Sequence, residues 1–485
     1  MMNSYIFTYI ICFIFILYVY IKILNQKYKI HNKKIVVVGG GLSGIVITLI
    51  LARHGYNIQL YDKNNDLGGN SKKASSGING YCDKLYKDMG GIDYFNKKFI
   101  NDIYNSTKKE YFSKYTKKLI NTLVNNNKKA INWLEKNNII FDDLQILGGH
   151  KYKRTLSNKN EASIGYYIIN NLKNKINKYN NIYHNNTSIY NVENINGEYI
   201  LHAKNVVNNK KIKINCDYLI IATGGFSYNI KKYINDDYIT SLPTSNGDFA
   251  IGDGIELGKK LNANIIDIKN IQIHPTGFID SNNINNKSKI LAPEFLRGIG
   301  GILINPLNKK RFCNELGKRD YIANKMKIQK INFFILLIPY QAYIDNKYKI
   351  DFYINKKLLY VYNLNNSNDM LYKTVKKYNY YSVVGEDKFN KKIFPNTPFN
   401  NKFIIGYITP IIHYCMGGIQ INENAQAIGV NGKIIRNLYA IGEVAGGLHG
   451  SNRLGGNSLL ECVVFGMIAA NNINKNMHKN WKKNI

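Results

Sequence analysis

The sequence predicts an α/β fold in which a domain built on a doubly wound parallel sheet is interrupted by a second domain. Apolar, β-branched runs begin at residues 34, 217 and 437, and such runs are typical of strands that are covered on both faces. From about Ile271 to about Ile412 the chain is rich in Ile, Tyr and Lys, which indicates an insertion. A chain of 485 residues has room for two or three domains.

The first strand leads into a glycine turn that is typical of dinucleotide-binding proteins. The expected strand Lys34–Val38 is followed by the pattern G-x-G-x-x-G over residues 39–44, and then by a predicted helix at 45–53. The glycines allow a tight turn, and the helix N-terminus offers free N–H groups to phosphates. A second strand, Asn57–Tyr61, ends at Asp62, where an acid can accept ribose hydroxyls. The glycine pattern is weak evidence alone, so the strand, helix and acid around it support the prediction.

The remaining elements follow in order. Helical periodicity dominates from Asp93 to about Asn177, and alternating strands with Asn-rich turns predict a meander at 182–214. The run at 217–226 enters a glycine turn and suits the second half of a dinucleotide-binding fold. Residues 252–254 open a helix with an acid near its N-terminus, which also fits simple capping. A strand at 437–443 and a closing helix complete the domain.

The charge of the chain does not indicate nucleic-acid binding. Lys and Arg number 66 against 32 Asp and Glu, which gives a net charge of +34. Nearly all of the basic residues are Lys, and Lys, Asn, Ile and Tyr have A/T-rich codons, so we interpret the charge as coding bias. No basic cluster is interleaved with aromatics. The few Arg are expected where a planar, two-pronged cation is required, namely at Arg53, Arg154, Arg297, Arg311, Arg319, Arg436 and Arg453.

The cysteines exclude several kinds of site. The six Cys are scattered, and none forms a C-x-x-C pair. This pattern excludes the usual zinc, iron–sulfur and c-type haem motifs. We therefore predict no metal, and we expect the thiols to lie in the core.

The N-terminus predicts a membrane anchor. Tyr5–Ile21 carries no charge and would form a helix of about 26 Å, which is marginal to adequate for a bilayer. A cleaved signal peptide is the alternative, but no small-residue cleavage site follows. Lysines follow the run, so the body of the protein would face the cytosol. The C-terminal residues 482–485 resemble a dilysine retrieval signal, which favours the endoplasmic reticulum, with the mitochondrion as the alternative.

Over Lys34–Ala470 the chain resembles the soluble fumarate reductases, which are flavoproteins related to the flavin subunit of succinate dehydrogenase. The resemblance rests on an ordered set of motifs. These are the glycine turn at residue 39, Gly-Gly-Asn-Ser, Ala-Thr-Gly-Gly, Gly-Asp-Gly, His-Pro-Thr, Glu-x-x-Arg-Gly, Asn-Glu-x-x-x-Arg-Asp, His-Tyr-x-Met-Gly-Gly and Gly-x-Asn-Arg-Leu-Gly-Gly-Asn-Ser.

The resemblance implies a Rossmann-like FAD-binding domain interrupted by an α+β capping domain that closes over the substrate. Together with the two terminal segments, which lie outside the resemblance, we expect the chain to have five parts. These are an N-terminal hydrophobic signal or anchor (1–33), the FAD-binding domain (34–273), the capping domain (274–412), the second part of the FAD-binding domain (413–475) and a basic tail (476–485).

The family's FAD contacts are implied for residues that come mostly from the glycine-rich motifs. Asn70 occupies the position at which covalent relatives attach FAD through a His, so the resemblance implies non-covalent FAD and a lower flavin potential, which favours fumarate reduction. The implied contacts are Gly39, Gly41, Gly44, Asp62, Gly69, Asn70, Ser71, Gly77, Thr223, Gly224, Asp253, Glu443, Asn457, Ser458 and Leu459.

The resemblance also implies the reaction, which is reduction of fumarate to succinate. Hydride passes from flavin N5 to one alkene carbon, and Arg319 protonates the other. Glu294 and Arg297 match the relay that reprotonates Arg319. The implied substrate clamp is His274, His413, Arg453 and the backbone of Gly456, and a dicarboxylate needs such paired cationic and imidazole donors.

Each candidate also has a purely structural interpretation. His274 precedes a Pro and fits a turn cap, and His413 fits a core histidine. Glu294 and Arg297 are three residues apart and fit a pair on a helix surface. Arg319 fits a solvated charge pair with the acid that follows it. Because the motifs occur together and in order, we interpret these residues as one site.

Other functions stay open. A sister flavoprotein could act on another unsaturated acid or on an amino acid, and a membrane-tethered protein could keep the flavin fold without activity. Pro293 departs from the family, whose members place a small or hydroxyl residue there, and the segment 325–373 matches loosely. The electron donor is left open among reduced free flavin, a partner protein and NADH.

Overall fold

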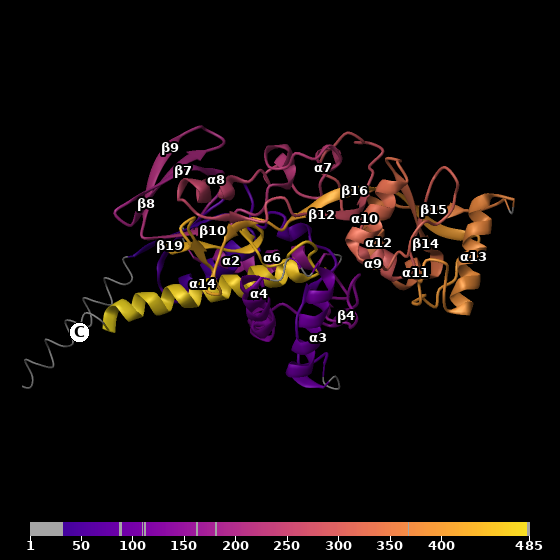
Figure 1. Ribbon diagram of the computed structural model, residues 1–485, viewed down its shortest axis with the longest axis horizontal. Helices are drawn as coiled ribbons and strands as arrows, with labels where there is room; N and C mark the ends of the chain where they lie inside the picture. The colour runs from indigo at the N-terminus through magenta and orange to yellow at the C-terminus, as the bar shows by residue number, and fades with distance from the viewer. Residues whose placement is uncertain are drawn as a thin grey trace, which may run out of the picture.

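The computed structural model of the protein describes residues 33–86, 90–108, 110, 113–161, 163–179, 182–366 and 368–482. The molecule is elongated, and the two ends of the described chain belong to one half while the orange middle of the chain forms the other (Figure 1). Within these residues no helix has the length and apolar character needed to cross a membrane. The predicted anchor at Tyr5–Ile21 and the last three residues of the chain lie outside the described residues.

A six-stranded sheet forms the centre of the first half. All neighbouring strands in it are parallel except at one edge, where β18 runs antiparallel to β19. The strands predicted at 34–38 and 57–61 are confirmed with those bounds. The sheet order is β18 (Gln426–Ile428), β19 (Ile434–Ala440), β10 (Tyr218–Ile221), β1 (Lys34–Val38), β2 (Asn57–Tyr61) and β6 (Tyr183–His184).

Helices cover this sheet. The helix after the glycine turn, α2 (Leu42–Arg53), begins three residues earlier than predicted, because Gly41 is already its N-cap. The closing helix α14 (Asn457–Lys482) packs along α2 beneath the sheet (Figure 1), and it continues into the segment predicted as a basic tail. The other helices of this half are α3 (Gly91–Ser106), α4 (Lys114–Asn125), α5 (Asn127–Lys136), α6 (Ile164–Ile176), α7 (Asp237–Ser241) and α8 (Asp253–Lys260), with the 3₁₀ turns η1 (Ser71–Lys73), η3 (Ser227–Lys232) and η4 (Gly442–Val444).

Smaller sheets surround the central one. The predicted meander is confirmed as an antiparallel sheet of β7 (Thr187–Ile195), β8 (Glu198–Asn205) and β9 (Lys211–Cys216). The segment predicted as helical at 93–177 also contains two strands, which were missed because strands of three residues leave no periodic signal. The other small sheets consist of β3 (Ile78–Asn79), β4 (Asp143–Gln145) and β5 (Thr155–Ser157), and of β11 (Ile265–Ile266), β17 (Gly418–Gln420) and β20 (Ala445–Gly446).

The second half is built on a separate antiparallel sheet with helices around it. Its strands β12 (Ile271–Phe278) and β16 (Lys402–Cys415) pair with each other and contain both of the predicted domain boundaries, at 274 and at 413. Buried residues from Phe278 to Ile408 pack in clusters of their own, whereas Ile412 and Cys415 belong to the core of the first half. The remaining elements are β13 (Ile302–Ile304), β14 (Phe334–Pro339), β15 (Tyr360–Asn363), α9 (Glu294–Gly298), α10 (Arg319–Ile328), α11 (Tyr340–Asp345), α12 (Lys347–Asn355) and α13 (Met370–Val384).

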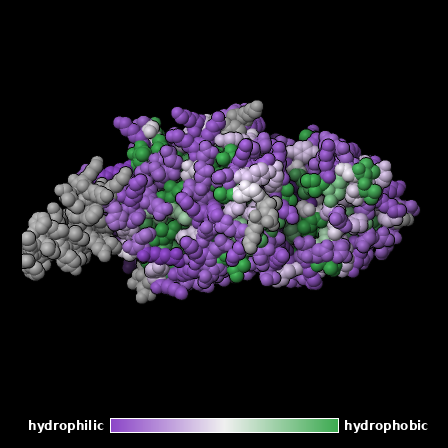
Figure 2. Space-filling view, turned by 90° about the horizontal axis from the view of Figure 1, so that it is seen from below, coloured by the Kyte–Doolittle hydropathy of each residue, from purple (hydrophilic) through white to green (hydrophobic). Residues whose placement is uncertain are grey.

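Polar residues cover most of one face of the molecule. The face in Figure 2 is mainly hydrophilic, and hydrophobic residues form small separate groups on it. Of the lysines in the described residues only Lys289 and Lys391 are buried, so nearly all of them lie where water can solvate them, as expected for side chains that are costly to bury.

Candidate active site

A cavity of about 830 Å³ is lined by residues from both halves of the molecule. Arg319, His413, Arg453 and Gly456 line it, and Tyr353 of α12 contributes from the capping half. The same wall holds thirteen of the fifteen residues implied to bind FAD. These are Gly39, Gly41, Asp62, Gly69, Asn70, Ser71, Gly77, Thr223, Gly224, Asp253, Glu443, Ser458 and Leu459.

Gly44 and Asn457, the two other residues implied to bind FAD, are not among the residues that line the cavity. Gly44 lies in the first turns of α2, and a Cβ there would be 2.0 Å from the carbonyl oxygen of Gly39. Gly44 therefore allows the helix to pack closely on the turn rather than touching a ligand. Asn457 is fully buried, and its Oδ1 accepts a hydrogen bond from Asn79 Nδ2 at 2.7 Å. It therefore orders the loop that carries Gly456.

The end of the cavity at the glycine turn fits a pyrophosphate. Gly39 has φ +108°, and a Cβ there would lie 2.4 Å from the carbonyl oxygen of Ala222, so other residues are excluded. Helix α2 begins behind Gly41, which has no side chain to cover its first turn. Thr223 Oγ1 is buried on this wall without a hydrogen-bond partner. The Leu42 N–H at the start of α2 donates to Ser71 Oγ at 3.2 Å, so a bound dinucleotide would meet the other N–H groups of this helix end and the unpartnered hydroxyl of Thr223.

Three of the acids on the wall, the ones implied to bind FAD, differ in their surroundings. Asp62 accepts hydrogen bonds from the backbone N–H of Gly40 at 2.6 Å and of Asn64 at 2.7 Å, so it braces the glycine turn, and burial raises its pKa. Asp253 pairs with Lys63 at 2.6 Å. Glu443 accepts from a backbone N–H at 2.9 Å, and burial raises its pKa to about 7. That Asp62 accepts the ribose hydroxyls and that Glu443 contacts FAD stay predictions.

Asn70 is fixed at the cavity by its amide group. Its Nδ2 donates to Asn246 Oδ1, and its Oδ1 accepts from the backbone N–H of Gly247 at 3.0 Å. Asn246 in turn donates to the carbonyl oxygen of His413 at 3.1 Å. One short network therefore joins the cofactor loop to a residue of the implied substrate clamp.

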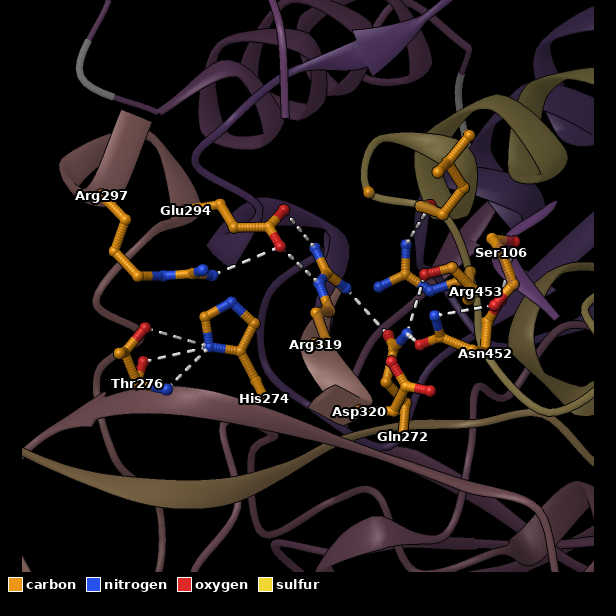
Figure 3. A network of polar contacts seen from close by, with 12 residues as sticks. Ser106, Gln272, His274, Thr276, Glu294, Arg297, Arg319, Asp320, Asn452 and Arg453 are labelled. Carbon is orange, nitrogen blue, oxygen red and sulfur yellow. Dashed lines mark hydrogen bonds and ion pairs between the residues drawn. The ribbon is translucent and has the colours of Figure 1, made fainter. Parts of the chain in front are cut away.

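Arg319 lies at the centre of the polar network in Figure 3. It is the first residue of α10, and its Nε and Nη2 donate to the two carboxylate oxygens of Glu294, each at 3.1 Å. Its third nitrogen, Nη1, donates to Gln272 Oε1 at 2.8 Å. The interpretation of Arg319 as a member of a solvated charge pair is wrong, because the side chain is buried and pairs with Glu294.

Arg297 forms the outer end of this network. Its Nη2 donates to Glu294 Oε1 at 3.3 Å, and its Nη1 donates to the carbonyl oxygen of Glu315 at 2.6 Å. Glu294 is 4% exposed and Arg297 2%, so the interpretation of a surface pair is wrong. Burial alone would raise the pKa of Glu294, but the charges of Arg319 and Arg297 outweigh it and lower the pKa to about 2.

Two imidazoles face each other near Arg319. The rings of His274 and His413 are 5.2 Å apart between centroids. His274 Nδ1 lies 3.2 Å from both the backbone nitrogen and the carbonyl oxygen of Thr276, so these contacts fit either ring tautomer, and Nε2 is buried without a partner. His274 thus caps a turn, as the structural interpretation predicted, and also presents an unpartnered ring nitrogen. Burial, followed by the charge of Arg319, lowers the pKa of both imidazoles well below the usual value.

Arg453 differs from the other two arginines of the site. It is 2% exposed, and no carboxylate of the described residues forms an ion pair with it. Its Nη1 donates to the carbonyl oxygen of Leu454 at 3.3 Å, and its Nε has no partner. Burial, followed by repulsion from Arg319, lowers the pKa of Arg453 to about 9. This site therefore holds a buried cation that lacks an anion.

Two residues that hold parts of this site in place were not predicted from the sequence. Gln272 accepts from Arg319 and donates to the carbonyl oxygen of Arg453 at 2.7 Å, so it joins the two arginines (Figure 3). Asn79 donates to the carbonyl oxygen of Gly455 at 2.6 Å. A signal for Gln272 existed, because it lies two residues before His274 in a strand and therefore on the same face.

The fold and the cavity together indicate the class of enzyme to which the protein belongs. The chain is an FAD-dependent oxidoreductase of the kind that acts on CH–CH bonds, and a family model for FAD-binding domains matches residues 34–459. Fumarate reductase 1 of Saccharomyces cerevisiae is 35% identical over 472 residues, which cover 90% of this chain and 98% of the yeast protein. A fumarate reductase of Schizosaccharomyces pombe is 32% identical over 474 residues, covering 92% and 90%.

The solved structures agree with the relatives. The open conformation of a flavocytochrome c3 fumarate reductase matches with a TM-score of 0.73 and 27% identity, and the match covers 94% of this chain and 81% of that chain. The protein therefore belongs to the fumarate reductase family of FAD-binding flavoproteins. The predicted fold class and the predicted FAD cofactor are confirmed.

Proposed function

We propose that the protein reduces fumarate to succinate. The observation that supports this most directly is the unpaired Arg453 on the wall of the cavity that also fits FAD. Burial of a guanidinium without a neighbouring anion raises the free energy of the folded protein, and a carboxylate of the substrate would offset this penalty. The relatives named as fumarate reductases support the choice of substrate.

The clamp would bind the two carboxylates from different sides. Arg453 offers an unpartnered Nε, His274 offers an unpartnered Nε2, and His413 lies against His274 with its Nδ1 2.8 Å from Ser245 Oγ. Because each imidazole is buried and neutral, each can donate only one hydrogen bond, whereas the guanidinium can make two parallel bonds. Such a clamp would also polarise the alkene, because its donors would bind the carboxylate oxygens on which charge develops.

The proton would come from Arg319. FAD, when bound, supplies the hydride at N5. The guanidinium of Arg319 is held on two sides, by Glu294 and by Gln272, so its remaining freedom is small. A guanidinium is a very weak acid, and it transfers a proton only to a strong base such as a substrate carbanion held against it. Glu294 and Arg297 form the continuous hydrogen-bonded path by which a proton returns to Arg319.

We further propose that FAD is bound without a covalent link. Asn70 carries an amide, which is not a nucleophile, and both ends of that amide are used in hydrogen bonds. The flavin should therefore stay with the native protein through gel filtration and leave completely on acid precipitation. Flavin fluorescence that remains on the denatured polypeptide would contradict this proposal.

The N-terminal run and the electron donor stay at the level of proposals. We propose that Tyr5–Ile21 anchors the protein in a membrane, with the endoplasmic reticulum favoured, and fractionation of the full chain against one beginning at residue 33 tests this. The donor is proposed to be reduced free flavin, a partner protein or NADH, and supplying each in turn to the purified enzyme would identify it.

Turnover of fumarate by the purified protein tests the proposed function. A chemically reduced dye is supplied without oxygen, and its oxidation is followed with fumarate and with a panel of other unsaturated mono- and dicarboxylates. We expect fumarate to be reduced with the highest kcat/KM. Preference for another unsaturated acid would identify a sister enzyme instead, and bound FAD without turnover of any acid would indicate a non-catalytic flavoprotein.

A further inference from the structure

Arg453 rests on the face of an aromatic ring. Its guanidinium carbon lies 4.4 Å from the ring centroid of Tyr414, which comes from β16. A cation attracted to an aromatic face is stabilised by the ring quadrupole, and the effect is larger when both groups are removed from water. Both side chains are buried. The ring therefore supports the cation without adding a negative charge.

Two further buried groups hold that ring. The Tyr414 hydroxyl donates to Glu461 Oε1, and Glu461 Oε2 lies 2.5 Å from His449 Nε2. The His449 ring also meets the Tyr414 ring edge-on, with centroids 5.6 Å apart. These three residues come from β16, from α14 and from the loop before Arg453, so their contact depends on the tertiary fold.

The Glu461–His449 pair is best described as neutral. Burial raises the pKa of Glu461 well above its ordinary value and lowers the pKa of His449 well below its own. A protonated Glu461 donates to His449 Nε2 through one oxygen and accepts from Tyr414 through the other, so each polar atom of the carboxyl has a partner. No charge is then placed behind the ring that supports Arg453.

Arg319 and Arg297 differ from Arg453 because each of them has a carboxylate partner. Both share the carboxylate of Glu294, which neutralises much of their charge. If Arg453 were paired in the same way, a substrate carboxylate would have to displace a protein carboxylate before it could bind. An aromatic support avoids this competition, because it orients the guanidinium while leaving its charge and its Nε free.

From this contrast, and resting on the proposed function, we infer that Tyr414, Glu461 and His449 form an uncharged bracket that positions Arg453 for the substrate carboxylate. Tyr414 is the residue in direct contact with the guanidinium. Glu461 and His449 act through Tyr414 by fixing the plane of its ring. All three are positioning residues, and none is required to touch the reacting atoms.

Substitutions at two positions of the bracket test the proposal in the holoenzyme. Tyr414→Leu removes the aromatic face, so we expect the Kd of succinate for the oxidised enzyme, measured by flavin absorbance, to rise at least tenfold. KM for fumarate should rise with it, while kcat falls less. Glu461→Gln keeps a neutral acceptor and donor at the same place, so its succinate Kd should stay within about threefold of wild type.

Tyr439→Leu is the matched control. Tyr439 is also a fully buried tyrosine whose hydroxyl is tied to α14, through Asn472 Oδ1 at 2.8 Å, but none of the described cations lies over its ring. It should lower the melting temperature about as much as Tyr414→Leu while leaving the succinate Kd unchanged. The FAD content of every variant is measured by its absorbance ratio, so that loss of cofactor is recognised.

Four outcomes would overturn the bracket, one of them together with the proposed function. A Glu461→Gln enzyme that binds succinate as weakly as Tyr414→Leu would show that a charged Glu461 supports Arg453. An unchanged Kd in Tyr414→Leu, or an equal rise in Tyr439→Leu, would remove the specific role of the ring. A wild-type enzyme that binds another carboxylate but not succinate would refute the proposed substrate alone, and the same variants are then compared with that acid. A wild type that binds no carboxylate refutes both.

Discussion

Arg319 and Glu294 meet as a two-pronged pair, with Nε to Oε1 and Nη2 to Oε2 both at 3.1 Å. Each of the two nitrogens has its own oxygen, so the pair fixes the plane of the guanidinium as well as its position. Glu294 comes from the short helix α9 and Arg319 from the start of α10, and both lie in the capping half. The proposed proton donor is thus held rigidly by the part of the molecule that covers the cavity.

Replacement of Arg319 by Lys should abolish most of the turnover. A lysine ammonium cannot reproduce the planar fork to Glu294 and also reach Gln272, although it keeps the charge. We expect fumarate reduction below about a tenth of wild type, with FAD content unchanged. Arg436→Lys, at an exposed arginine, is the control and should retain full activity. Turnover above a tenth in Arg319→Lys would argue against a guanidinium-specific role.

The ion pairs of Glu294 should stabilise the protein over a defined pH range. Its pKa of about 2 in the folded protein is lower than the ordinary value of about 4.3, so its ionised form favours folding. The shift corresponds to about 3 kcal/mol, which is fully present above about pH 5 and is lost as the pH falls toward 2. Glu294→Gln should therefore melt lower than wild type at pH 7, with a difference that narrows below pH 4.5. A difference independent of pH would contradict the pairing.

His150 should make the protein less stable in mild acid. Its Nε2 donates to the carbonyl oxygen of Gly455 at 3.1 Å, and burial, followed by the charge of Arg154, lowers its pKa to about 3. Below pH 6.5 this histidine binds a proton in the unfolded chain but stays neutral in the folded protein. Its contribution therefore lowers the free energy of unfolding by about 1.4 kcal/mol for each unit by which the pH falls.

The His150→Gln variant isolates this effect, because Gln keeps a donor and does not titrate. Its melting temperature should fall less steeply than that of wild type between pH 6.5 and 5. His54→Gln, at an exposed histidine, should follow the wild-type curve. Parallel curves for wild type and His150→Gln would refute the prediction.

Gln272 should affect activity although it carries no charge. Gln272→Leu removes the hydrogen bond to Arg319 and the bond to the carbonyl oxygen of Arg453 while keeping the volume. Both arginines then lose one constraint, so we expect kcat/KM for fumarate to fall about tenfold or more, with FAD retained. Gln426→Leu, on the edge strand β18, serves as the control. Steady-state kinetics near wild type would show that the two arginines are held sufficiently by their other contacts.

The sequence predicted the nucleotide-binding half well because its signals are local. The strands at 34–38 and 57–61 and the glycine turn between them depend on residues that are neighbours in the chain. The structure shows why the glycines are required, since a Cβ at Gly39 or Gly44 would collide with backbone. The short strands β4 and β5 could not be predicted, because β5 pairs with β3, which lies far along the chain, and β4 pairs in turn with β5.

The candidate site was predicted in part. The rarity of Arg and the order of the motifs singled out Arg297, Arg319 and Arg453 as functional candidates. They did not reveal that Glu294 is buried between two of these arginines, or that Gln272 joins Arg319 to the backbone of Arg453. Arg319 lies 25 positions from Glu294 and 47 from Gln272, and Gln272 lies 181 positions from Arg453, and no pattern along the chain records these pairings.

By itself the sequence determined the architecture and the class of ligand, because glycine turns, apolar strands and rare arginines are properties of residue type and spacing. Only the tertiary structure decided which arginine is neutralised and which is left free. That distinction arises from packing: α9 places a carboxylate against Arg319, whereas β16 places an aromatic face against Arg453. The burial and the partner of each arginine are determined only when these elements pack together, and the difference between Arg319 and Arg453 follows from that packing.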